Sequence, residues 1–159
     1  RDGHTTIFDY WSVDTIRRWR NGGKFDGKML TEDQKHIYSI YQRILTLCNK
    51  EKAITEGEFF DLMYANTNGW RFNEHKQYTF LRKAGKELLF IIVNFDHISV
   101  DVAINVPSHA FDFLQIPQMD IYPAVDLLTG KTESISLLPY KATEVSVEGY
   151  SGKILKIKL

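Results

Sequence analysis

The sequence predicts an all-β antiparallel sandwich that is preceded by a loop and an amphipathic helix. From residue 78 to the C-terminus, apolar and polar residues alternate in short segments separated by turns, which is typical of antiparallel strands. Residues 31–50 instead repeat their apolar side chains with the period of a helix. The change of period indicates a boundary near residue 52. We therefore expect one part over residues 1–52 and a β-domain over residues 53–159, which has the usual size of a domain.

The first half of the β-domain contains three expected strands. Residues 78–82 and 87–95 predict a hairpin that turns at Gly85. Residues 88–93 are apolar on both faces, so we expect a central strand that is covered on both sides. Residues 100–106 alternate valine and isoleucine with polar or small residues, which predicts a strand with one face in water.

The second half predicts two further hairpins. They are residues 122–127 with 134–137, which flank Gly130, and residues 143–148 with 153–159, which flank Gly149 and Gly152. In the last strand, Leu155, Ile157 and Leu159 are expected on one face, and Lys156 and Lys158 on the other.

Residues 31–50 predict the longest helix of the chain. Thr31 and Gln34 have the spacing of a capping box, in which each side chain accepts a hydrogen bond from the other residue's backbone N–H. Apolar side chains then share one face, namely Ile37, Tyr38, Tyr41, Ile44, Leu45 and Cys48. A face this apolar requires a partner surface, and the irregular residues before it do not supply one.

Residues 1–30 are rich in glycine and predict one short helix. Ser12 would cap it, Asp14 lies in its first turn, and Ile16 and Trp19 share one face. Because the sequence begins with Arg1 rather than Met and contains no secretory signal, we expect a processed or cut N-terminus. The cellular compartment therefore stays unknown.

The composition excludes several classes of function. Twenty Lys and Arg balance 20 Asp and Glu, so the basic surface of a nonspecific nucleic-acid-binding protein is not expected. No apolar run has the length of a membrane span, and the single cysteine, Cys48, forms neither an internal disulfide nor a zinc site. Phosphate-binding and dinucleotide-binding glycine motifs are absent, and we expect no cofactor. The sequence also gives no reason to expect a metal.

Titratable side chains do not form a catalytic motif. His4 beside Asp2 or Asp9 is a possible acid–base pair, but a histidine in a loop is more often only solvated.

Two other groups of reactive side chains have simpler explanations. Glu56, Glu58 and Asp61 are clustered, yet a glycosidase needs two carboxyl groups at a fixed separation across the scissile bond. A charged outer face explains them better. Cys48 lies on the apolar helix face, where a buried and unreactive thiol is expected.

Aromatic residues gather in two loops. Phe8, Tyr10 and Trp11 lie in the first, and Trp70 and Phe72 in the second. Exposed rings of this kind stack on the apolar C–H faces of sugars. Alternatively, they anchor their loops to the core, because aromatic side chains bury the most area.

Several segments, read in order, resemble the α-amylase family, glycoside hydrolase family 13. Residues 2–11, DGHTTIFDYW, resemble the loop after the eighth strand of that family's barrel, and residues 21–27 its continuation. The helix from Thr31 resembles the final barrel helix. The start of the family's C-terminal β-domain is matched by residues 54–62, its first hairpin by residues 78–82 and 88–95, and its later strands by residues 126–130 and 138–140.

The resemblance implies a C-terminal fragment: the last barrel loop and helix over residues 1–52 and the C-terminal β-sandwich over residues 53–159. The family cleaves or transfers α-glucosidic linkages with retention. Its catalytic Asp, Glu and Asp would all precede Arg1, so no residue of this chain inherits a catalytic role. Tyr10 and Trp11 would lie on the substrate side of the barrel and are candidates for sugar contacts. The calcium ligands of relatives would also lie upstream.

Three hypotheses follow. In the first, the chain is the non-catalytic part of an α-glucan hydrolase, is inactive alone, and stabilises the rest of the same enzyme's barrel. The alternative is a stand-alone carbohydrate-binding module that stacks sugars on Trp70 and Phe72 or on Tyr10 and Trp11. The third, an unrelated protein-interaction domain, depends only on the apolar helix face.

Overall fold

The computed structural model describes residues 13–159, which belong to two compact units that divide between Leu45 and Thr46. The first unit contains the short helix α1 (Asp14–Arg20), the turn η2 (Asn21–Gly23) and the greater part of α2 (Glu32–Lys50). Asp14 lies in the first turn of α1, as expected, and Ser12, its expected cap, lies outside the described residues.

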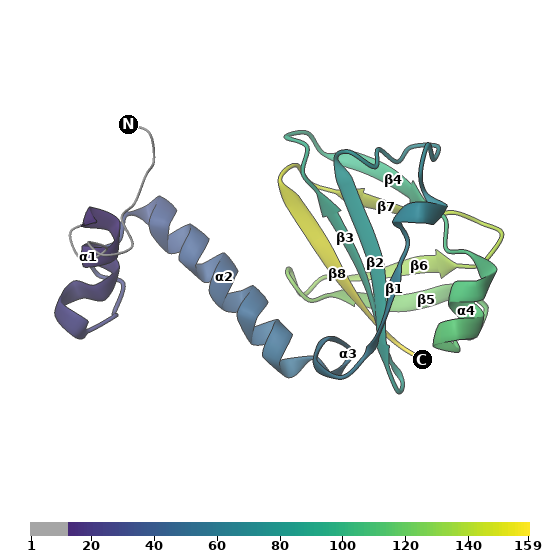
Figure 1. Cartoon of the computed structure of the whole chain (residues 1–159), viewed down its shortest axis with the longest axis horizontal. Coiled ribbons are helices and arrows are strands. Elements are labelled where there is room, and N and C mark those ends of the chain that lie inside the picture. Colours follow the sequence, from purple (N-terminus) through teal and green to yellow (C-terminus); the bar gives the residue numbers. More distant parts are fainter. Residues whose placement is uncertain (1–12) are drawn as a thin grey trace. The chain divides into compact units, whose positions relative to one another are not determined.

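The second unit is an antiparallel β-fold (Figure 1). Its six-stranded sheet has the order β1-β2-β3-β8-β5-β6, and β4 pairs with β7 in a second sheet. The six strands of the larger sheet are β1 (Glu58–Asp61), β2 (Gln77–Ala84), β3 (Glu87–Asn94), β5 (Met119–Asp126), β6 (Thr132–Leu137) and β8 (Ser151–Lys158). The smaller sheet contains β4 (Val100–Ile104) and β7 (Thr143–Val147). The described structure therefore confirms the expected all-β fold.

One apolar core lies between the two sheets. Phe90 of β3 and Leu155 of β8 reach it from the larger sheet, and Ile104 of β4 and Val145 of β7 from the smaller. The helix α4 (Ser108–Leu114) closes one edge with Phe111 and was not expected from the sequence. All of these side chains are buried, so most of the hydrophobic free energy of folding resides in this unit.

The central strand β3 is buried on both faces, as its sequence predicts. Leu88 and Phe90 face the main core. Leu89 and Ile91 face the other way and pack against Ala53 of the short helix α3 (Lys52–Thr55). A strand covered on both sides cannot place polar residues on either, which explains its unbroken apolar run.

The structure corrects one expected hairpin. The strands β7 and β8 both form, but they do not pair with each other. Instead, β7 pairs with β4, and β8 lies between β3 and β5. The connection at Gly149 passes within 2.2 Å of the His97 carbonyl oxygen, measured from where a Cβ would lie. Because only glycine allows that approach, Gly149 permits the chain to cross between sheets rather than to make a tight turn.

Candidate functional site

Among the described residues, α2 carries a prominent exposed apolar surface. The helix begins with the predicted capping box. The Thr31 N–H donates to Gln34 Oε1 over 3.0 Å, and the Gln34 N–H donates to Thr31 Oγ1 over 3.3 Å. These two bonds satisfy N–H groups that the first turn of a helix leaves without partners.

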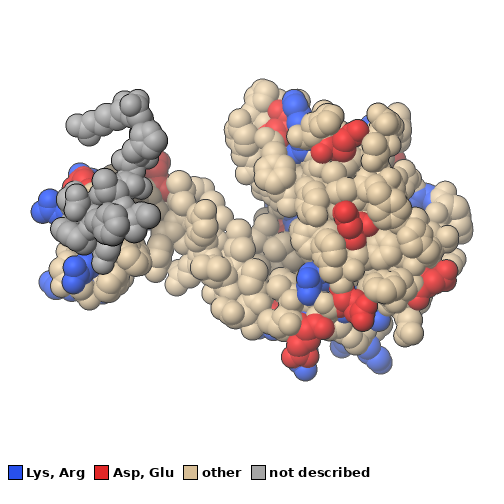
Figure 2. Space-filling view, viewed as in Figure 1, with Lys and Arg blue, Asp and Glu red and all other residues tan. Residues whose placement is uncertain are grey.

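One face of α2 is apolar and exposed. We call it the helix face, and it consists of Ile37, Tyr38, Tyr41, Ile44 and Leu45. Tyr41 is 65% exposed and Leu45 58%, and no residue of α2 is buried. Cys48 continues the same face and is half-buried. In Figure 2 the visible surface over α2 is nearly all uncharged, in contrast to the mixed charges of the β-domain. A contiguous apolar surface of this kind indicates an interaction site.

A polar junction fixes the chain just after α2 to the larger sheet. Lys156 of β8 lies between two carboxylates, with its Nζ atom bonded to Glu51 and 2.8 Å from Glu87 Oε2. The other carboxylate oxygen of Glu87 accepts the Ala53 N–H over 2.9 Å. Glu51 is buried, so its charge requires the partner that Lys156 supplies.

Arg82 of β2 completes this junction. Its guanidinium donates to the backbone carbonyls of Ala53 and Gly57, each over 2.7 Å. Gly57 lies so close to Ala53 that a Cβ would approach the Ala53 carbonyl oxygen to 2.2 Å. The segment 51–57 is therefore held by side chains from β2, β3 and β8, and larger residues at position 57 are excluded.

The junction shifts the pKa values of Glu87 and Lys156. Burial alone would raise the pKa of Glu87, but hydrogen bonds from Lys156 and from the Ala53 amide lower it below the usual range. Burial alone would lower the pKa of Lys156, but its bonds to Glu51 and Glu87 raise it. The folded state thus favours the charged form of both groups, as in a structural ion cluster rather than a general acid or base.

The sequence did not predict this junction, because its members are far apart in the chain. A weak signal was present: Arg82, Leu89 and Lys156 are opposite one another across three neighbouring strands, on the face away from the main core. Only the pairing order of the strands brings Lys156 next to Glu51 and Glu87, and Arg82 next to the carbonyls of Ala53 and Gly57. Lys156 was expected in water, and in the structure it is two-thirds covered.

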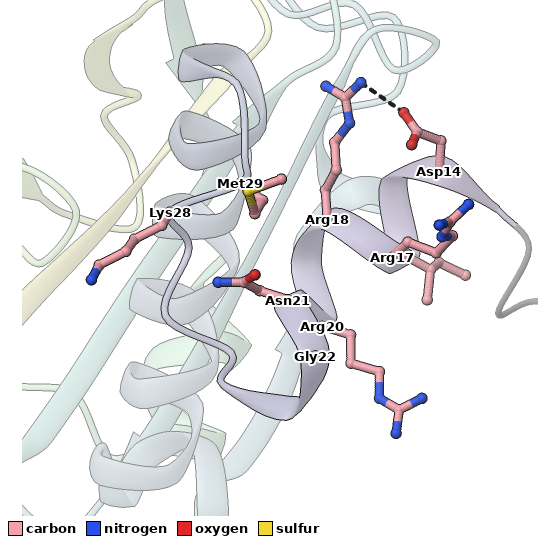
Figure 3. Close-up of a pocket in the computed structure, with 9 residues that line it drawn as sticks. Asp14, Arg17, Arg18, Arg20, Asn21, Gly22, Lys28 and Met29 are labelled. Atoms are coloured by element: carbon pink, nitrogen blue, oxygen red, sulfur yellow. Dashed lines mark ion pairs between the residues drawn. The ribbon is translucent and has the colours of Figure 1, made fainter.

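The first unit contains an open depression (Figure 3). It is lined by Asp14, Ile16, Arg17, Arg18, Arg20, Asn21, Gly22, Lys28 and Met29. Asp14 and Arg18 form an ion pair of 2.8 Å, which the dashed line in Figure 3 marks. Asp14 is the only carboxylate among the described residues that line the depression, so these residues do not supply the pair of carboxylates that glycoside hydrolysis needs.

The expected sugar contacts Tyr10 and Trp11 lie outside the described residues, as do His4, Asp2 and Asp9. Their roles stay predictions. Among the clustered carboxylates, Glu56 and Glu58 are exposed. Asp61 accepts the Met63 N–H over 2.9 Å, which is a structural role at the end of β1.

The structure separates Trp70 from Phe72. Phe72 is buried in the main core, whereas Trp70 is 70% exposed. The two rings therefore cannot form the expected common stacking platform. Phe72 instead anchors the loop from which Trp70 projects.

Two kinds of feature are absent from the described residues. Within residues 13–159, no three His, Cys, Asp or Glu side chains come together as a set of metal ligands. The helices of the same segment include none with the length and hydrophobicity of a membrane span.

Comparison with solved structures identifies the same fold within larger proteins. A noncanonic maltogenic alpha-amylase from Thermotoga neapolitana matches with a TM-score of 0.60 and 14% identity, over 83% of this chain and 27% of its own. The protein AmyP in complex with maltose matches with a TM-score of 0.57 and 22% identity, over 83% of this chain and 23% of its own. An alpha-amylase from Geobacillus thermoleovorans, complexed with acarbose, matches with a TM-score of 0.54 and 13% identity, over 77% and 23%.

The chain thus has the fold of one part of these proteins and spans about a quarter of their length. The match covers 83% of the chain, which is more than the second unit, residues 46–159, makes up. It therefore includes residues of the first unit. The expected fold relationship to α-amylases is confirmed. The sequence itself matches no protein-family model and no curated protein.

Proposed function

We propose that the chain is the C-terminal, non-catalytic part of a longer α-amylase-family glycoside hydrolase, here called the parent enzyme. The observation that carries the proposal is the exposed helix face. It occurs on a chain whose fold matches about a quarter of the length of solved alpha-amylases. The missing part would be a (β/α)8 barrel, whose outer helices pack their apolar sides inward. In this proposal α2 is the last helix of that barrel and residues 53–159 are the domain that follows it.

The proposed role of the β-domain is to hold α2 in place and to stabilise the barrel. The junction of Arg82, Glu87 and Lys156 supports this role, because it fixes the backbone directly after the helix. A helix whose end is already fixed loses less conformational entropy when it packs against the barrel than a helix whose end is free.

The parent enzyme would act on α-glucosidic linkages, while the chain alone would be inactive. The titratable side chains that line hollows among the described residues support the inactivity of the chain alone. Asp96 lines a second hollow, between the loop before β2 and the first residues of β4, and the hydrogen bond that Lys76 donates to it lowers its pKa, whereas the general acid of a glycosidase needs a raised pKa. The maltose and acarbose in two of the matched structures support an α-glucan as the parent's substrate.

The alternative, a stand-alone carbohydrate-binding module, has less support. Of its two expected pairs of rings, Trp70 and Phe72 do not form a common platform because Phe72 is buried, and Tyr10 and Trp11 lie outside the described residues. It also leaves the helix face without a partner.

Ile44→Asp tests the proposal, because it places a charge on the helix face. In the isolated chain Ile44 is exposed, so the melting temperature should hardly change. In the parent enzyme the charge would be buried without a partner, and the loss of stability should be about 3 kcal/mol or more. Ser39→Asp is the matched control, since helical geometry places Ser39 on the opposite side of α2 and it is exposed.

Deletion of residues 53–159 from the parent enzyme tests the role of the β-domain. The deletion should lower the melting temperature or the solubility of the barrel. An unchanged melting temperature, or an equal effect of Ile44→Asp and Ser39→Asp in the parent, would contradict the proposal.

A further inference from the structure

Two asparagines of the chain are each followed by a glycine, Asn21 by Gly22 and Asn68 by Gly69. In such a pair the backbone nitrogen of the glycine can attack the side-chain amide carbon of the asparagine, because glycine has no Cβ to obstruct the approach. The two pairs have the same chemistry and lie in different units of the chain. Their surroundings therefore decide which of them reacts.

The pair Asn21–Gly22 lies in an open turn where α1 ends (Figure 3). A Cβ placed on Gly22 would meet no atom within 4 Å, so the space beside the attacking nitrogen is open. None of the described residues of the first unit, 13–45, is buried. A segment without buried side chains opens at a small cost in free energy, so its backbone reaches the geometry of attack readily.

The pair Asn68–Gly69 is fixed instead. It lies in the loop between η3 (Met63–Ala65) and β2, where the Gly69 N–H donates to the Asn66 carbonyl over 3.0 Å. Asn66 is fully buried, and its side chain forms hydrogen bonds with backbone groups on both sides of the loop. Phe72, which follows the pair, is buried in the main core. The Gly69 nitrogen is held by its hydrogen bond, so this loop must open before the nitrogen can attack.

The Asn21 side chain is part of the turn that it ends. Its Nδ2 atom donates to Asp26 Oδ1 over 2.8 Å, and the same oxygen accepts the Lys28 N–H over 3.2 Å. The hydrogen bond from Asn21, followed by that from Lys28, lowers the pKa of Asp26, so Asp26 is a carboxylate at neutral pH. A carboxylate holds the amide nitrogen of Asn21 but supplies no proton to it. Asp26 therefore slows the loss of this nitrogen rather than promoting it.

We propose that Asn21 is a site of spontaneous deamidation and that the reaction opens the turn at the end of α1. The Gly22 nitrogen loses its proton to solvent and forms a bond to the Asn21 side-chain carbon, and the bond from that carbon to Nδ2 breaks. Nδ2 takes a proton from solvent and leaves as ammonia, and a cyclic imide remains. Water then adds to one of the two imide carbonyl carbons and opens the ring, which yields aspartate or isoaspartate. One water is consumed, one ammonia is released, and nothing is oxidised or reduced.

The product changes the contact with Asp26. A second carboxylate takes the place of the amide that now donates to Asp26, so a hydrogen bond of 2.8 Å is replaced by repulsion between like charges. Isoaspartate also lengthens the backbone by one carbon at the residue that ends α1, which has a φ of 43°. The link between the end of α1 and residue 26 is therefore lost in one irreversible step. This inference concerns the chain itself and goes beyond its proposed role in the parent enzyme.

Incubation of the folded 159-residue chain in slightly alkaline buffer, followed by peptide mass spectrometry, tests the proposal. We expect Asn21 to be converted about tenfold faster than Asn68 or more, because only the second site requires the opening of a loop that is fixed to the core. Concentrated urea provides the internal control. Neither structure persists there, so the two Asn–Gly pairs should react at similar rates.

Asp26→Ala separates the role of the turn from that of the Asn–Gly sequence. It frees the Asn21 side chain and should accelerate conversion at Asn21 several-fold, while the rate at Asn68 stays the same. In the converted wild-type chain, NMR titration of the Asp26 carboxyl should show a raised pKa, because a donor has become a negative charge.

Several results would overturn the inference. Equal rates at Asn21 and Asn68 in the folded chain would do so, as would an Asn21 that stays intact in the folded chain while both sites react in urea. An unchanged rate at Asn21 in Asp26→Ala, or an unchanged Asp26 pKa after conversion, would contradict the assigned contact. These measurements do not involve the helix face, so this inference and the proposal that Ile44→Asp tests fail independently.

Discussion

The helix α2 and the β-domain bury their apolar side chains to opposite extents. In the β-domain, Phe90 and Leu155 are fully buried between two sheets. In α2, Tyr41 and Leu45 belong to an equally regular apolar pattern, yet both are more than half exposed. A periodic apolar pattern therefore specifies which face will be buried, but it does not specify the surface that buries it. The β-domain contains its own partner layers, whereas the apolar face of α2 is exposed.

Substitutions of one aromatic residue in each region test this comparison most strongly. Phe90→Ala should lower the free energy of unfolding by about 3–5 kcal/mol, because it leaves a cavity in a closed core. Tyr41→Ala, in the isolated chain, should change it by less than ~0.5 kcal/mol. Urea unfolding of both variants gives the two values. Similar costs would mean that the helix face is already covered within this chain.

Loss of the ammonium group at the junction should have the next largest effect. Lys156→Met leaves Glu51 and Glu87 without their shared cation and should cost about 2–3 kcal/mol. Lys158→Met, at the exposed end of the same strand, is the control and should cost less than ~0.5 kcal/mol. If the two variants unfold at the same urea concentration, the junction does not stabilise the β-domain.

Acid should weaken the same junction. The pKa of Glu87 is lower in the folded chain than its ordinary value of 4.5, so its contribution to stability is present above that pH. The contribution is lost as the pH falls from 4.5 through the lower folded pKa, because the unfolded chain then binds the proton more readily.

Unfolding of Glu87→Gln between neutral pH and about pH 3 measures this effect, and its stability should depend less on pH than that of wild type. Glu56→Gln changes an exposed carboxyl and should keep the wild-type profile. Identical profiles for wild type and Glu87→Gln would exclude the assigned role.

The smallest expected effect concerns the start of α2. Thr31→Ala removes one half of the capping box and should destabilise the first turn by about 1 kcal/mol. Hydrogen exchange of the amides in that turn should accelerate accordingly. Gln34→Glu keeps an acceptor at the same position and should preserve the protection. Equal exchange in Thr31→Ala and wild type would mean that tertiary contacts, rather than the cap, hold this end.

Local patterns in the sequence predicted the local structure well. The capping box at Thr31 and Gln34 formed as expected, and so did the hairpin of β2 and β3. Both features depend on residues close together in the chain. The double-sided burial of β3 was also predictable, since an uninterrupted apolar run requires cover on both faces.

Features that depend on distant residues were not predictable. The partner of β8 is set by the whole sheet, and a short loop rich in glycine suggested a hairpin that did not form. Trp70 and Phe72 have similar side chains, two positions apart, and only the packing of the loop decides which one is buried. The junction at Lys156 combines groups from residue 51 to residue 156, and it exists only once the strands are in order.

The most direct test of the central claim is the intact mass of the native protein, with sequencing of any peptides upstream of Arg1. We predict a native chain longer by at least the ~250 residues of a (β/α)8 barrel. Its upstream peptides should carry the Asp, Glu and Asp of an α-amylase-type catalytic site. A native chain that begins near Arg1 would contradict the account, because the helix face would then have no barrel to cover it.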